Sequence, residues 1–323
     1  MNNVEFASTG VQISEMCLGT MMFGDRCDET ESALVLNTAL ENGVNFVDTA
    51  ASYCNGKTEE ILGRLLKGKR DQIFLGTKVT RSTDADWILQ SLDESLTRLQ
   101  TDYIDLYMIH WPREQMNVTA MMEALNKTVV AGKALFIGCC NFPAWLVAHC
   151  NAIAERNCWA KLINNQIPYN LIERGVEVEV LPQAIAENIA ITTYRPLLAG
   201  ILAGKYKPDE AIPEDSRGST DKRIPVWLEK FADGLRKYHA FAEERNLHPA
   251  QLSVAWLRKS EGVTAPVIGV SSARQLAASL AAFDYDLTDD EYEQVNGMFD
   301  TAVKEETGGN YPNLRRMTTL IAK

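Results

Sequence analysis

This 323-residue sequence lacks any long uninterrupted apolar segment. Charged residues or glycine break every candidate before it reaches the roughly 20 residues that a membrane-spanning helix needs. The opening residues also lack the basic and then apolar pattern of an export signal. We therefore expect a cytoplasmic protein without a membrane partner.

Positive charge is also scarce, because 32 Lys and Arg residues stand against 43 Asp and Glu residues, for a formal net charge of -11. Nucleic acids and anionic membranes are bound through concentrated basic surfaces, and the sequence has none. We therefore expect a small-molecule substrate and no nucleic-acid partner. The composition leaves open whether the protein is a monomer or a homo-oligomer.

Cysteine has no paired pattern: the seven residues are an odd number and follow no framework-like spacing. This predicts reduced thiols, as is usual in the cytoplasm. Cys139 and Cys140 are adjacent, but no CxxC motif or histidine pair accompanies them, so we interpret them as structural. We predict no metal site.

The sequence does contain a rhythm of short apolar runs. They are continuous rather than alternating, which is typical of strands covered on both faces of a parallel sheet. We predict strands at 17–20, 45–50, 73–78, 104–110, 134–140, 162–167, 190–195 and 266–270. Stretches between them predict helices near 30–42, 58–67, 84–99, 118–131, 143–156, 176–188, 249–260 and 272–282.

Eight alternating strand and helix units at this length predict the α/β fold class, as a (β/α)8 TIM barrel. We expect a single domain over residues 1–323. Residues 4–14 are typical of an N-terminal β-hairpin that would close the barrel floor. Residues 226–245 and 288–298 predict extra helices, added to the eightfold plan.

Polar residues stand where the predicted strands end. In a barrel these ends converge on one rim, so Asp48, Lys78 and His110 are expected at the same mouth, with Tyr53 close by. A tyrosine beside a lysine, a carboxylate and a histidine is suited to protonating a carbonyl. A nearby ammonium is expected to lower the tyrosine pKa from its usual value of about 10.

Tyr53 and Lys57 also form a YxxxK motif, the spacing that pairs these residue types on a helix in short-chain dehydrogenases. Asn55 and Gly56 disfavour a helix here. No glycine-rich phosphate turn follows the first strand, as a Rossmann fold would need. We therefore interpret Lys78 as the partner of Tyr53.

Several short motifs follow one another along the chain. They are GTMMFG (19–24), NFVDTAASY (45–53), TK (77–78), IH (109–110), CN (140–141), YRPL (194–197), LAGKY (202–206) and VIGVSSARQL (267–276). Each is weak alone, but together and in this order they are specific. From residue 4 to near residue 300, the chain resembles the aldo-keto reductases.

The resemblance implies a catalytic set made of Tyr53, Lys78, Asp48 and His110. In the implied reaction a nicotinamide cofactor gives hydride to the carbonyl carbon of an aldehyde or ketone, and Tyr53 protonates the oxygen. Asp48 would orient Lys78, while His110 would steer the carbonyl oxygen. The resemblance therefore implies an oxidoreductase.

The resemblance also implies a cofactor site at the same mouth. Tyr194 would stack on the nicotinamide, and Asn141 and Gln166 would bond its carboxamide. Lys205 and Arg217 would hold the diphosphate and 2′-phosphate, which favours NADP, with NAD as the alternative. The other implied contacts are Gly19, Thr20, Met21, Asp48, Arg195, Pro196, Leu197, Gly200, Gly269, Ser271, Ser272, Gln275 and Ser279.

The sequence leaves open the roles of one residue, Arg195, and of one segment, residues 307–317. Arg195 replaces a serine that is usual in the family, and its charge could reach the substrate pocket or pair with an acidic residue. Residues 307–317 could fold over the pocket or pack on the barrel. From loop position, we expect the substrate to contact Met22, Phe23, Tyr53, His110, Trp111 and Trp227.

Two alternative functions stay open. Potassium-channel β subunits resemble the chain closely, which would make it a cofactor-sensing regulatory subunit. Their branch carries Asn at the histidine position, so His110 favours an enzyme. The second alternative is a sugar or alcohol dehydrogenase that works in the oxidative direction, because the catalytic residues do not set the direction.

Overall fold

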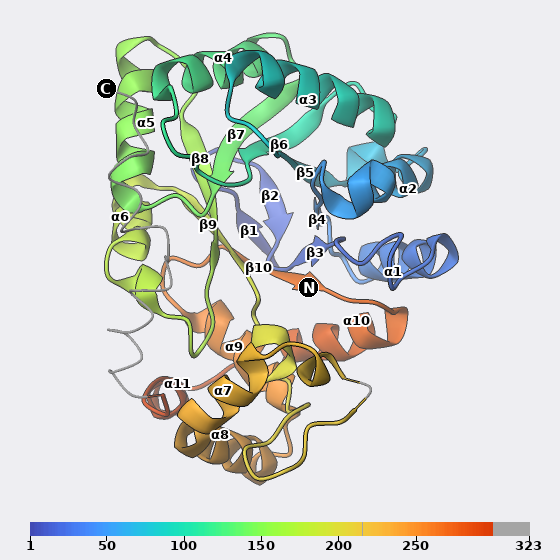
Figure 1. The fold of residues 1–323 in the computed structure, drawn as a ribbon, viewed down its shortest axis with the longest axis vertical. Helices are drawn as coiled ribbons and strands as arrows, with labels where there is room; N and C mark the ends of the chain where they lie inside the picture. Colours follow the sequence, from blue (N-terminus) through green and yellow to red (C-terminus); the bar gives the residue numbers. More distant parts are fainter. Residues whose placement is uncertain (215, 300–323) are drawn as a thin grey trace.

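The computed structural model describes residues 1–214 and 216–299, apart from the side chain of Arg217. Its centre is a closed barrel of eight strands in the order β10-β3-β4-β5-β6-β7-β8-β9, with parallel neighbours (Figure 1). The predicted (β/α)8 barrel is confirmed. Its strands are β3 (Cys17–Gly19), β4 (Phe46–Asp48), β5 (Phe74–Val79), β6 (Ile104–Ile109), β7 (Ala134–Cys140), β8 (Leu162–Pro168), β9 (Ala190–Tyr194) and β10 (Ala265–Gly269).

Helices alternate with the strands and surround the barrel (Figure 1). They are α1 (Glu29–Glu41), α2 (Lys57–Leu65), α3 (Ala85–Leu99), α4 (Val118–Val130), α5 (Ala144–Arg156), α6 (Val180–Glu187), α7 (Arg223–Lys230), α8 (Ala232–Glu244), α9 (Pro249–Lys259), α10 (Ala273–Leu280) and α11 (Asp289–Asn296). Residues 226–245 form two helices rather than one, because the backbone of Phe231 leaves the helical region. Within the described ranges, no helix has the length and apolar character needed to cross a membrane.

The strands read as continuous apolar runs because both of their faces are covered. All six residues of β6 are buried, including the charged Asp105. Asp105 is tolerated there because its carboxylate pairs with Arg70 at 2.6 Å and accepts the backbone N–H of Leu75 at 2.8 Å. Burial on both faces therefore explains the pattern from which the sheet was predicted.

An antiparallel hairpin of β1 (Asn3–Glu5) and β2 (Gln12–Ser14) closes one end of the barrel. Phe6 follows β1 and is completely buried. Its ring lies 4.8 Å from that of Phe74 and 6.2 Å from that of Phe46, and these two residues begin β5 and β4. The hairpin therefore covers the amino-terminal ends of the strands, as predicted, and leaves the carboxyl ends for a site.

Candidate active site

A buried ion pair joins the neighbouring strands β4 and β5. Lys78 Nζ lies 2.6 Å from each carboxylate oxygen of Asp48 and donates to the carbonyl of Thr49 at 2.8 Å. The side chains of Lys78 and Asp48 are only 0% and 2% exposed. Burial alone would lower the pKa of Lys78, but the Asp48 carboxylate outweighs it and raises the pKa above its usual value. Lys78 is therefore a fixed positive charge.

Tyr53 begins a short 3₁₀ turn, Tyr53–Gly56, that leads into α2. Its hydroxyl oxygen lies 3.5 Å from Lys78 Nζ. Gly56 has a φ of 95°, a left-handed conformation that favours glycine, and it separates the turn from the helix. Lys57 begins α2 and is exposed. The geometry thus pairs Tyr53 with Lys78 and not with Lys57.

His110 follows β6, where its backbone N–H donates to the carbonyl of Val79 at 3.1 Å. Its imidazole meets the ring of Tyr53 edge-on, with the centroids 6.1 Å apart. Burial, and then the positive charges of Lys78 and Arg113, lower the pKa of His110 to about 3. The imidazole is therefore neutral near pH 7, with one N–H to donate and one nitrogen to accept.

The pKa of Tyr53 differs from the expectation drawn from the sequence. Burial raises the pKa to about 12, and the opposing effect of Lys78 is smaller. The Asp48 carboxylate opposes the effect of Lys78, because it acts to raise the pKa of Tyr53. The predicted net lowering is therefore wrong, and Tyr53 is a protonated phenol at neutral pH.

Asp48, Tyr53 and His110 line a pocket of about 500 Å³ at the carboxyl ends of the strands, while Lys78 is buried beside Asp48. Its lining includes sixteen of the predicted residues: Gly19, Thr20, Met21, Met22, Asp48, Tyr53, His110, Trp111, Asn141, Gln166, Tyr194, Arg195, Pro196, Leu197, Gly200 and Gly269. It also includes residues that were not predicted as site residues: Cys140, Leu198, Ala199, Val267 and Ile268. Three of them lie within the quoted motifs and the other two directly follow YRPL, so their position in the chain was a usable signal.

Three further polar side chains at this mouth, Asn141, Gln166 and Tyr194, are linked by hydrogen bonds to His110 or Asp48. The hydroxyl of Tyr194 donates to Asn141 Oδ1 at 2.7 Å, and Asn141 Nδ2 donates to the carbonyl of His110 at 3.2 Å. Gln166 Nε2 donates to Asp48 Oδ1 at 2.9 Å. Two amides beside an aromatic ring, in a pocket of this size, fit the ring and carboxamide of a nicotinamide.

Arg195 directs its charge to an acidic residue. Its Nη1 lies 3.0 Å from Glu173 Oε1, and the Glu173 side chain is only 9% exposed. The Arg195 guanidinium also lies 5.4 Å from the ring centroid of Trp227. Arg195 therefore combines the two options that the sequence left open, because it lines the pocket and its charge is paired with Glu173. Trp227 packs on Arg195 and is not part of the pocket lining.

Phe23 lies outside the pocket. Its side chain is completely buried in the core, and its carbonyl accepts the hydroxyl of Thr58 at 2.8 Å. The GTMMFG motif therefore places Met21 and Met22 at the pocket and turns Phe23 inward. The structure does not support the predicted contact between Phe23 and a substrate.

The predicted phosphate contacts gather at the start of α10. Ser272 caps this helix by accepting the N–H of Gln275 at 3.3 Å, and the Gln275 side chain accepts the N–H of Ser271 at 3.0 Å. Ser279 lies one turn further on, and its hydroxyl donates to the carbonyl of Gln275. N–H groups at a helix start suit an anion, but here those of Ser271 and Gln275 already donate to the side chains of Gln275 and Ser272.

A carboxylate that the sequence reasoning missed lies at the same helix start. Glu31 of α1 accepts the N–H of Ala273, the first residue of α10, at 2.7 Å. The two residues are 242 positions apart, so no local pattern could have indicated the contact. A negative charge therefore already lies where a phosphate was expected.

The two predicted cationic phosphate contacts are Lys205 and Arg217, and the structure describes the side chain of Lys205. Lys205 is exposed, with its ammonium 5.9 Å from the ring of Tyr206. The side chain of Arg217 is outside the described part of the chain, and so are residues 307–317. The predictions for Arg217 and for this segment therefore stay predictions.

Comparisons with known proteins agree with this architecture. A family model described as the aldo/keto reductase family matches residues 15–299. An uncharacterized oxidoreductase of Bacillus subtilis, YrpG, is 32% identical over 90% of this chain and 94% of its own. A probable voltage-gated potassium channel subunit beta of Arabidopsis thaliana is 29% identical over 88% of this chain and 92% of its own. The solved structure of the glycerol dehydrogenase AKR11B4 from Gluconobacter oxydans has a TM-score of 0.80 and 26% identity, over 92% of this chain and 94% of that one.

The closed barrel, the pocket at the carboxyl ends of its strands and the aldo/keto reductase model that matches residues 15–299 together place the chain among the oxidoreductases. The family match extends over most of the chain. The chain belongs to the aldo/keto reductase family.

Proposed function

We propose that the protein reduces an aldehyde or ketone to an alcohol with NADPH, and that Tyr53 is the general acid. The observation that supports this most is the position of the Tyr53 hydroxyl, 3.5 Å from Lys78 Nζ, in a pocket that His110 also lines. A carbonyl oxygen bound between Tyr53 and His110 would meet an O–H and an N–H donor. This arrangement suits the protonation of a carbonyl.

Each member of the group has a distinct role in this proposal. Tyr53, whose pKa is raised to about 12, holds its proton until the oxygen becomes basic. Lys78 then stabilises the phenolate left behind, since its positive charge is 3.5 Å away. Asp48 keeps Lys78 in place. His110 is neutral and orients the carbonyl oxygen without competing as the acid.

The cofactor part of the proposal depends on the amide pair and the start of α10. Asn141, Gln166 and Tyr194 are proposed to hold the nicotinamide, which when bound supplies the hydride. Ser271, Ser272 and Gln275, with Lys205 and Arg217, would bind the phosphates of NADP. Met22 and Trp111, which line the pocket, are proposed to contact the substrate.

Two other functions have some support from the comparisons. The likeness to a glycerol dehydrogenase favours oxidation of an alcohol or polyol. The raised pKa of Tyr53 disfavours that direction at neutral pH, because a phenol cannot accept the proton of an alcohol. The likeness to a potassium channel β subunit favours a cofactor-sensing role, which would require tight cofactor binding without turnover.

The proposal is tested by measuring NADPH and NADH oxidation with aliphatic, aromatic and sugar carbonyls. We expect Tyr53→Phe to lower kcat by about 10²-fold or more, which is typical for loss of a general acid. Tyr103→Phe is the matched control, since Tyr103 packs under Arg70 just before β6, at the opposite end of the barrel. Activity retained in Tyr53→Phe would refute the catalytic assignment. Cofactor binding without turnover of any carbonyl would favour the sensing role.

A further inference from the structure

A second pocket, of about 280 Å³, adjoins the first at the mouth of the barrel. His110 and Trp111 line both pockets, so they form the boundary between them. Ser52, which precedes Tyr53, also lines the second pocket. A molecule bound with its carbonyl at Tyr53 could therefore extend past His110 into this space.

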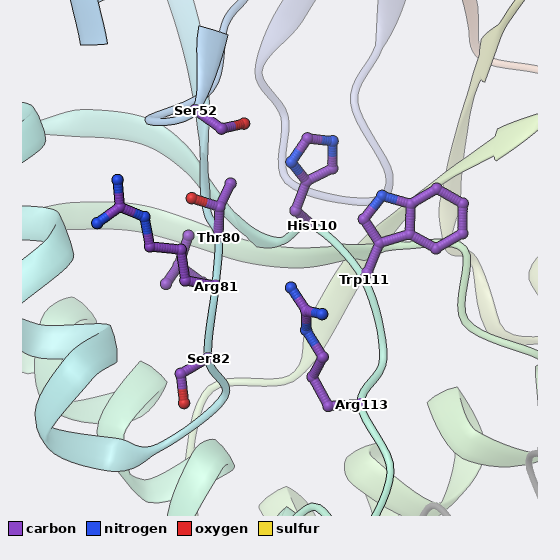
Figure 2. A pocket seen from close by; sticks show the side chains of 8 residues that line it. Ser52, Thr80, Arg81, Ser82, His110, Trp111 and Arg113 are labelled. Atoms are coloured by element: carbon purple, nitrogen blue, oxygen red, sulfur yellow. The ribbon is translucent and has the colours of Figure 1, made fainter. Parts of the chain in front are cut away.

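The lining of the second pocket is positively charged, in contrast to the chain as a whole. The protein has a formal net charge of -11, yet the lining contains Arg81 and Arg113 and no Asp or Glu. Figure 2 shows Arg113 reaching toward His110 from the loop after β6, while the guanidinium of Arg81 points away from Arg113. The positive charge of Arg113 is one cause of the lowered pKa of His110. Arg113 is thus the main positive charge facing this side of His110.

Most side-chain hydrogen-bond donors that line this pocket have no hydrogen-bond partner in the described part of the chain. Within residues 1–214 and 216–299, neither Arg81 nor Arg113 has an ion pair or a side-chain hydrogen bond, and Arg81 only lies over the ring of Trp87. Ser82 is the exception among the hydroxyls, since it donates to the carboxylate of Asp84. An anion bound here would meet the Arg113 guanidinium directly, with the hydroxyls of Ser52 and Thr80 at the wall.

We propose that this second pocket is a substrate subsite for an anionic group, and that the protein prefers carbonyl compounds that carry a carboxylate or phosphate several bonds from the carbonyl. The inference rests on the proposed reductase function. Arg113 is the specificity-determining residue, because its guanidinium can bind a carboxylate or phosphate through two parallel N–H donors. Arg81 adds a weaker, longer-range attraction.

The test compares kcat/KM for matched pairs of substrates with NADPH. The pairs are 4-carboxybenzaldehyde with methyl 4-formylbenzoate, and glyceraldehyde 3-phosphate with glyceraldehyde. The wild-type protein is expected to favour the anionic member of at least one pair, and the pair that responds identifies carboxylate or phosphate as the recognised group. Arg113→Met is expected to lower the ratio of anionic to neutral kcat/KM by about tenfold, as for loss of a hydrogen bond to a charged group.

Three comparisons separate this role from a general effect. Arg113→Lys keeps the charge but loses the planar fork, so its ratio should lie between those of the wild type and Arg113→Met. Arg156→Met, in an exposed arginine at the end of α5, should leave the ratio unchanged. The preference should also weaken with added salt, because the guanidinium is exposed.

Three results would overturn the subsite, and they differ in what else they affect. If neutral aldehydes are reduced but the ratio is the same in wild type and Arg113→Met, the subsite is wrong and the reductase function stands. If no carbonyl in either pair or in the wider panel is reduced, the proposed function fails and the subsite fails with it. Equal losses for both members of each pair would also reject it, because Arg113 would then have only a structural effect.

Discussion

Replacing Lys78 with methionine should expose how strongly the buried pair holds this mouth together. Both side chains are almost fully buried, and Lys78 Nζ contacts both oxygens of Asp48 at 2.6 Å. Lys78→Met keeps the length of the side chain but leaves the Asp48 carboxylate without its cation. Breaking a buried pair in this way costs about 3–5 kcal/mol of stability. Gln166 can compensate only in part, through its single bond of 2.9 Å.

The double variant Asp48→Asn/Lys78→Met distinguishes a lost pair from a stranded charge. The double variant removes both charges, so its free energy of unfolding should return to within about 2 kcal/mol of the wild-type value. Both the double variant and Lys78→Met should be catalytically inactive. Chemical unfolding would be followed by far-UV circular dichroism and tryptophan fluorescence, since the chain has six Trp. Since Asp48→Asn also strands a buried charge and should cost a similar amount, the expected coupling energy between the two substitutions is at least about 4 kcal/mol, above the roughly 0.5–3 kcal/mol that is usual for residues in contact.

The pH dependence supplies a further check on this reasoning. The pKa of Lys78 is raised in the folded protein, so its contribution is fully present below the unfolded pKa of about 10.4 and is lost only as the pH rises through the folded value. The destabilisation by Lys78→Met should therefore be constant between pH 6 and 9.

Additive effects of the two single substitutions, with a coupling energy below about 0.5 kcal/mol, would refute the buried pair as we describe it.

Three further predictions concern other parts of the barrel. Acidification from pH 6.5 to 4 should destabilise the wild type more than His110→Gln. The pKa of His110 is about 3 in the folded protein and about 6.5 in the unfolded chain, so only the unfolded chain binds the extra proton. Equal slopes of Tm against pH for the two proteins would contradict this. Glu31→Gln should raise the affinity for NADP⁺ relative to NAD⁺ about two- to fivefold, because it removes a part-exposed negative charge at the start of α10. Fluorescence titrations would measure the two affinities, with Glu41→Gln as the control. An unchanged ratio of affinities would contradict this prediction. Phe6→Ala should lower the free energy of unfolding by about 3–5 kcal/mol in urea titrations and leave KM unchanged, since Phe6 lies at the closed end of the barrel; a large change in KM would refute this.

Much of the architecture could be predicted because the signals are local. Strands buried on both faces must be continuously apolar, and β6 shows this with six buried residues in a row. Gly56 marked the break between Tyr53 and Lys57, because a left-handed turn there excludes a continuous helix. The structure groups Asp48, Tyr53 and His110 at one pocket, with Lys78 buried against Asp48, where the order of the strands predicted them. Phe23 differs because a loop motif does not tell which of its side chains turns inward.

The barrel, its rim and the kinds of chemical group gathered there could be predicted from the sequence, because strand order and burial pattern depend on neighbouring residues. The partner of Arg195, which is Glu173, and the carboxylate at the start of α10, which is Glu31, could be identified from the folded structure alone. The folded structure also reversed the expected direction of the Tyr53 pKa shift. The physical reason is common to these cases: desolvation and ion pairing depend on distances and burial in three dimensions, which no local pattern encodes.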